Sequence, residues 1–163
     1  MNTRANALAD RFERGVSALA EFATNLTTAE WTARVPKDGR SVGVVVHHVA
    51  SVLPIEIHLA QVLASGKAVT GVTMDDIHEA NAAHARDNAD VTKDEALRLL
   101  KRNSEAAVVV IRSLTDEQLD RAAPVSLYKN APLTTQFMLE DHAVRHSYHH
   151  LTLLRQALAF QPA

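Results

Sequence analysis

Histidine is the residue whose number and spacing in this sequence point most directly to chemistry. The 163-residue chain contains nine His and no Cys, and four of the His cluster near the C-terminal end, at positions 142, 146, 149 and 150. His146 and His150 are four residues apart, so on a helix their imidazoles project one turn apart on the same face. Ring nitrogens placed in this way can bind one divalent metal ion at about 2.0–2.1 Å.

A third His lies on the predicted buried side of another helix. Two series of positions recur at intervals of three and four residues, which is typical of the core-facing side of a helix in a bundle. The series are Val45, His48, Val52, Ile55, Leu59, Val62 and Leu139, Ala143, His146, His150, Leu153, Ala157. We therefore expect His48, His146 and His150 to meet in the core as metal ligands. Three protein ligands leave coordination positions for water or substrate, as in catalytic metal sites.

A simpler interpretation of these His must be weighed against metal binding. A single His on an apolar face is usually a core residue whose nitrogens are satisfied by carbonyl groups or water, and the spacing of His146 and His150 often occurs by chance. Three unpaired imidazoles in one core would be costly to bury, however, and a shared metal ion removes that cost.

The remaining His and the nearby acidic residues are expected to be less central. His142, one turn before His146, is predicted at the edge of the buried face, where it is an alternative ligand. The others are expected at the surface or behind the ligands, and no partner for the ligands can be assigned from the sequence. His47 and His149 are expected at the surface or behind the ligands, and His78 and His84 in solvent. Glu140 and Asp141 are expected to face away from the three His.

The same periodicity predicts an all-α fold, and no segment alternates as a strand would. Long helices are expected over 4–25, 41–65 with Ser41 as N-cap, 92–113, and from Thr134 or Thr135 to about 159. Short helices are expected around Trp31 with Thr28 as cap, after Thr73 and after Thr115, with a kink at Pro54 and a loop over 124–132. Residues 1–163 are therefore predicted to form a single four-helix-bundle domain with additional short helices.

Composition excludes several classes of protein. With 17 Lys and Arg against 19 Asp and Glu, the net charge of −2 does not suit a nucleic-acid-binding protein. The absence of Cys excludes disulfides, Cys-based zinc sites and a protein thiol nucleophile. The N-terminal segment lacks the pattern of a secretory signal, and the longest apolar runs are far shorter than the roughly 20 residues of a membrane span. We expect a cytoplasmic protein with no nucleic-acid or membrane partner.

Two segments resemble the DinB superfamily. In "RSVGVVVHHVA" a Ser is followed seven residues later by a His, as in the family motif that contributes one metal ligand, and this assigns His48. The segment "DHAVRHSYHHLTLLRQAL" is similar to the family's last helix, with its two ligands at His146 and His150. Many members follow the last His with Arg-Gly, whereas Leu151 and Thr152 stand here, and this difference concerns the shape of the substrate pocket.

The resemblance implies a DinB-like bundle, a divalent metal (zinc, nickel or iron), a small-molecule substrate and a homodimer. Characterised relatives include thiol-dependent S-transferases and maleylpyruvate isomerases that use mycothiol, bacillithiol or glutathione. The leading hypothesis is a low-molecular-weight-thiol S-transferase in which the three-His metal activates an exogenous thiol. The alternatives are a metal-dependent hydrolase with metal-bound water as nucleophile, or a non-catalytic, stress-related bundle that binds a metal or another ligand.

Overall fold

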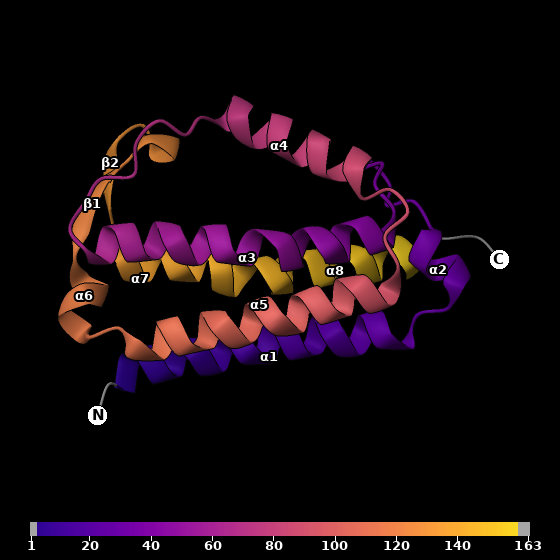
Figure 1. Ribbon diagram of the computed structural model, residues 1–163, viewed down its shortest axis with the longest axis horizontal. Helices are drawn as coiled ribbons and strands as arrows, with labels where there is room; N and C mark the ends of the chain where they lie inside the picture. Colours follow the sequence, from indigo (N-terminus) through magenta and orange to yellow (C-terminus); the bar gives the residue numbers. More distant parts are fainter. Residues whose placement is uncertain (1–2, 160–163) are drawn as a thin grey trace.

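Four long helices form a bundle in the computed structural model, which describes residues 3–159 (Figure 1). They are α1 (Thr3–Asn25), α3 (Val42–Ala64), α5 (Lys93–Ser113) and a last helix in three consecutive parts. Those parts are α7 (Thr135–Met138), a π-helical turn η2 (Leu139–Val144) and α8 (Arg145–Ala159). The predicted all-α four-helix bundle with additional short helices is confirmed.

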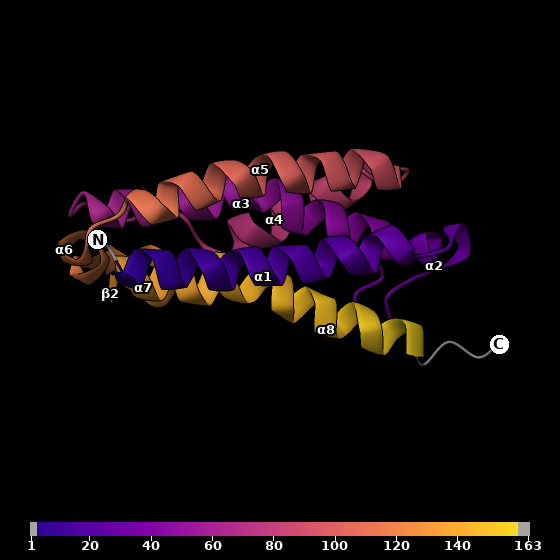
Figure 2. The same ribbon diagram turned by 90° about the horizontal axis from the view of Figure 1, so that it is seen from below.

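The helices do not follow one another around the bundle. Helix α1 packs against α5 and α8, and α3 packs against the same two helices, so the consecutive long helices α1 and α3 lie diagonally opposite. Figure 2 shows α1 between α5 and α8. The chain runs in the same direction along α3 and α5, because α4 (Met74–Asp87) carries it back between them (Figure 1). The topology therefore makes α3 a direct neighbour of the last helix.

Helix starts are fixed by local side-chain caps. Ser41 caps α3, and Thr73, Thr92 and Thr115 each form a capping box that opens α4, α5 and α6 (Asp116–Asp120), as predicted. The short helix α2 (Thr28–Thr32) is capped by Thr27, one residue before the predicted Thr28. Its Trp31 is buried, with the indole in close contact with Gly43 and its Nε1 donating to the Val91 carbonyl at 3.0 Å.

The segment expected to be a loop is a β-hairpin instead. Strands β1 (Ala122–Val125) and β2 (Ala131–Thr134) pair antiparallel, with Pro124 opposite Pro132. Proline cannot donate to the ladder, so two Pro within four-residue strands do not look like a sheet in the sequence. The connection contains the 3₁₀ turn η1 (Ser126–Tyr128), and this turn brings Tyr128 to the last helix.

The buried faces of two helices differ from the predicted ones. In α3 the core positions after His48 are Val49, Leu53, Ile57, Ala60 and Leu63, whereas Ile55 is 59% exposed. Apolar residues occupy nearly every side of α3, so the periodicity does not select one face. In α8, Leu154 is buried and Leu153 is 38% exposed, because a spacing of three or four residues after His150 satisfies the helical period equally well.

Helix α3 is long and apolar enough to cross a membrane by length and composition alone, but 61% of its most apolar window is buried inside the bundle. It is the central helix of the core and continues through Pro54.

Candidate metal centre

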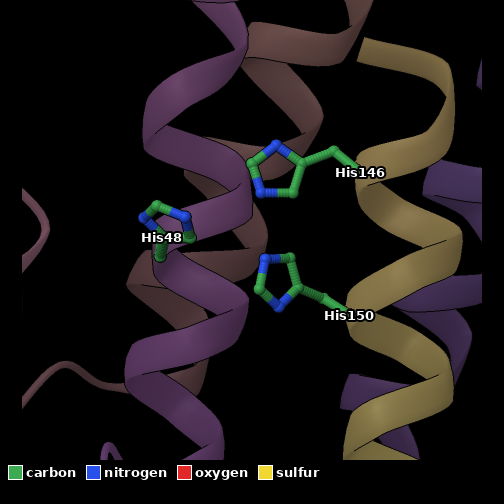
Figure 3. A group of neighbouring side chains, drawn as sticks. All are labelled: His48, His146 and His150. Carbon is green, nitrogen blue, oxygen red and sulfur yellow. The ribbon is translucent and has the colours of Figure 1, made fainter. Parts of the chain in front are cut away.

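The structure brings together the three His that the sequence analysis selected. One ring nitrogen from each of His48, His146 and His150 lies within 4.8 Å of the others. The rings of His146 and His150 extend from α8 toward His48 on α3 (Figure 3). The ring centroid of His48 lies 5.3 Å from that of His146 and 5.5 Å from that of His150. That these residues bind a metal stays a prediction.

The chemical state of the cluster suits a divalent cation. Burial, together with the neighbouring His146, lowers the pKa of His48 to about 3 and that of His150 to about 2, so both rings are neutral at physiological pH. Neutral imidazole is the form that binds metal. The Nδ1 atoms of His48 and His150 are buried without a hydrogen-bond partner within residues 3–159. Three converging imidazoles, two of them with unpartnered nitrogens, fit a three-His divalent metal site.

A buried carboxylate orients one of the three rings, and the sequence analysis missed it. Glu56 of α3 is 6% exposed and its Oε1 accepts a hydrogen bond from His146 Nδ1 at 2.5 Å. This bond leaves His146 Nε2 as the nitrogen available to the cluster, an arrangement common behind metal-binding His. The signal was present in the sequence, because Glu56 is the only Asp, Glu, Lys or Arg of α3.

The cluster continues toward α4, contrary to prediction. His84 was expected in solvent, but it is half-buried; its Nε2 lies 2.9 Å from His47 Nδ1, and its ring meets that of His48 edge-on at 5.5 Å. Every residue of α4 is described and none is buried, so this His pair ties α4 to the core helix. The remaining predicted surface positions hold, since His78 and His149 are exposed.

One cavity is lined by residues of the cluster, and a second, larger one is lined by other residues. The smaller, of about 120 Å³, is lined by Asp141, His142, Arg145, His146, His149 and His150. Asp141 therefore faces the site, contrary to prediction, whereas Glu140 is turned toward Arg11. His142 is outside the group of three and contacts Tyr128 instead.

The larger cavity, of about 870 Å³, lies between α4 and the segment from α2 to the start of α3. Arg34, Arg40, Arg86 and Lys93 give its lining more positive than negative charge. Arg40 reaches the cluster electrostatically, because its charge contributes to the lowered pKa of His48 and of His150.

A helical bundle in which two facing helices present three converging His has the donor set of a divalent-metal site. The sequence matches the DinB superfamily over residues 11–154, and the chain belongs to that superfamily. YfiT from Bacillus subtilis has the same fold, with a TM-score of 0.78 at 17% identity over 98% of this chain and 88% of the YfiT chain. YfiT is described as a probable metal-dependent hydrolase with an unusual four-helix bundle topology. No curated protein sequence matches the chain.

Replacing any one of the three clustered His with Ala should abolish stable metal binding, because two imidazoles alone hold a divalent ion weakly. Elemental analysis after dialysis against zinc, nickel or iron(II) should give about one metal ion per chain for the wild type and a small fraction of that for His48→Ala, His146→Ala and His150→Ala. His149→Ala and His78→Ala serve as controls and should keep the wild-type content. Equal metal content in all five variants would contradict the assignment.

Substitution Glu56→Gln should weaken metal binding by about 10- to 100-fold while the fold is retained, since the variant loses the carboxylate that orients His146. Competition with a chromophoric chelator measures this affinity. Glu79→Gln, at an exposed position on α4, is the matched control. An affinity for Glu56→Gln equal to that of the control would show that the carboxylate has no such role.

The metal-free protein should lose stability as the pH falls below 6.5. The pKa of His48 and of His150 lies far below the usual value near 6.5, so between pH 6.5 and about 3 the unfolded chain binds protons that the folded chain does not. Each of these two His lowers the free energy of unfolding by up to about 1.4 kcal/mol for every pH unit below 6.5. Above pH 6.5 the two rings are neutral in the folded and in the unfolded chain, so no stability is lost there through their protonation.

Denaturant unfolding between pH 7.5 and 4 tests this dependence. A double variant, His48→Gln with His150→Gln, should show a shallower fall than the wild type, and the exposed His78→Gln should not. Identical slopes for the wild type and the double variant would count against burial of neutral rings.

Proposed function

We propose that the protein is a metal-dependent hydrolase of a small carboxylic ester or amide, with His48, His146 and His150 as the metal-binding residues. The convergence of three imidazoles beside a cavity, with those of His48 and His150 buried, is the observation that carries this proposal. The description of YfiT as a probable metal-dependent hydrolase supports it at the level of the fold. When bound, a divalent ion at such a site lowers the pKa of a nucleophile and polarises a carbonyl group.

Residues of the protein orient one ligand, keep two others neutral and leave space for water and substrate. Glu56 holds His146 with Nε2 toward the cluster. Burial keeps His48 and His150 neutral, so protons do not compete for their nitrogens near pH 7. The smaller cavity has room for a few water molecules, each of which takes about 30 Å³. The larger cavity has the volume of a typical small-molecule site, and its excess of cationic residues favours a substrate with an anionic group.

A low-molecular-weight-thiol S-transferase is the second candidate, and the cationic lining of the larger cavity favours it. The chain has no Cys, so any thiolate must arrive from outside, and the larger cavity can hold a thiol that carries carboxylates next to its cationic lining. The same three His would hold the metal, which would activate the exogenous thiol in place of water. A non-catalytic bundle that only binds a metal is the outcome if neither reaction occurs.

Two assays on the metal-loaded protein separate these functions. We expect p-nitrophenyl acetate to be hydrolysed without added thiol, at least 10-fold faster than by the metal-free protein or by His150→Ala. Turnover only with added thiol, followed with 1-chloro-2,4-dinitrobenzene as electrophile, would establish the transferase and overturn the hydrolase. Lack of turnover in both assays would overturn both enzymatic functions.

A further inference from the structure

Three polar side chains form a connected chain beside the His cluster. Tyr128, on the 3₁₀ turn of the hairpin, donates its hydroxyl hydrogen to Asp141 Oδ2 at 2.6 Å. The same hydroxyl oxygen lies 3.0 Å from His142 Nε2. Asp141 and His142 belong to the π-helical turn η2, and both line the small cavity together with His146 and His150.

The protons in this chain can be assigned from donor and acceptor capacity. A phenol has one hydrogen, and the short contact with a carboxylate, which only accepts, uses it. Burial and Asp141 raise the pKa of Tyr128 to about 12, so the phenol keeps that hydrogen near pH 7. The contact between Tyr128 and His142 therefore has the His142 Nε2 hydrogen as donor. In a neutral ring this tautomer leaves the lone pair on Nδ1.

His142 lines the small cavity and is partly exposed. Its side chain is 25% exposed. The buried ring nitrogens that lack a partner within residues 3–159 belong to His48, His84 and His150, and Nδ1 of His142 is not one of them. Burial lowers the pKa of His142, which keeps the ring unprotonated and able to accept. Asp141 is held in turn by Arg145, whose Nε lies 3.1 Å from Asp141 Oδ1. Arg145 therefore holds Asp141, and Asp141 accepts the hydrogen bond of Tyr128. Tyr128 in turn holds the His142 ring through Nε2.

We propose that His142 is the general base of the hydrolysis proposed above, with Tyr128 and Asp141 as positioning residues that lock its tautomer. The proposal rests on that function and assigns residues to it. As a water oxygen bonds to the substrate carbonyl carbon, a water proton moves to His142 Nδ1. The imidazolium formed then gives this proton to the leaving oxygen or nitrogen as its bond to the carbonyl carbon breaks. An ester and water yield an acid and an alcohol, and His142 returns to its neutral state.

The tautomer lock can be tested without any activity. Long-range ¹H–¹⁵N correlation spectra of the ¹⁵N-labelled protein distinguish the two neutral tautomers, and the His142→Gln spectrum assigns the signals. We expect His142 as the Nε2–H tautomer in the wild type and a mixture of tautomers in Tyr128→Phe. Tyr148→Phe, which removes a hydroxyl bonded to the Arg11 carbonyl, is the matched control and should leave His142 unchanged. A Nδ1–H tautomer in the wild type would overturn the proposal.

The catalytic role is tested with p-nitrophenyl acetate and the metal-loaded protein. His142→Gln should keep the wild-type metal content and KM while kcat falls at least 100-fold, which is the scale of general-base catalysis. Added imidazole should restore part of that loss, and Tyr128→Phe should lower kcat by a smaller factor. His78→Gln, on the exposed side of α4, should behave as the wild type.

The possible failures are distinguishable. Loss of metal in His142→Gln would make His142 a ligand and overturn the proposal, as would an unchanged kcat. Absence of hydrolysis by the wild type would overturn the proposed function and the base with it, whatever the spectra show for the tautomer.

Discussion

The burial of neutral imidazoles between α3 and α8 is the constraint on which the rest of the site depends. A polar ring in an apolar core is stable only if its surroundings compensate for the lost water. Within residues 3–159 only part of this compensation is present: His146 has Glu56, whereas Nδ1 of His48 and of His150 has no hydrogen-bond partner. The bundle topology makes this possible, because α3 and the last helix are direct neighbours although they are far apart in the chain.

The parts of the fold that could be predicted from the sequence are those with local causes. A helix cap is decided within four residues, and Ser41, Thr73, Thr92 and Thr115 were found in this way. The spacing of His146 and His150, with His48 at a matching position, was sufficient to select the three residues that meet. Each of these inferences needs only the geometry of one helix and the tendency of apolar faces to pack together.

The parts that the sequence did not reveal depend on contacts between distant segments. The hairpin was missed because Pro124 and Pro132 argue against strands, and their pairing is visible only in three dimensions. His84 was misplaced because α4 has no buried residues and yet lies over the cluster. The partner of Glu56 is 90 positions away in the chain, and no periodicity encodes such a separation.

The π-helical turn has a consequence for how this protein can vary. A π turn contains one residue more than an α-helical turn, and it is usually confined to a single turn within a longer helix. Deletion of one residue at 139–144 would convert this turn to an α-helical one, whereas in a regular α-helix the same deletion would rotate everything on one side by about 100°. The imidazoles of α8 would thus keep their phase relative to the start of the last helix if the turn lost one residue.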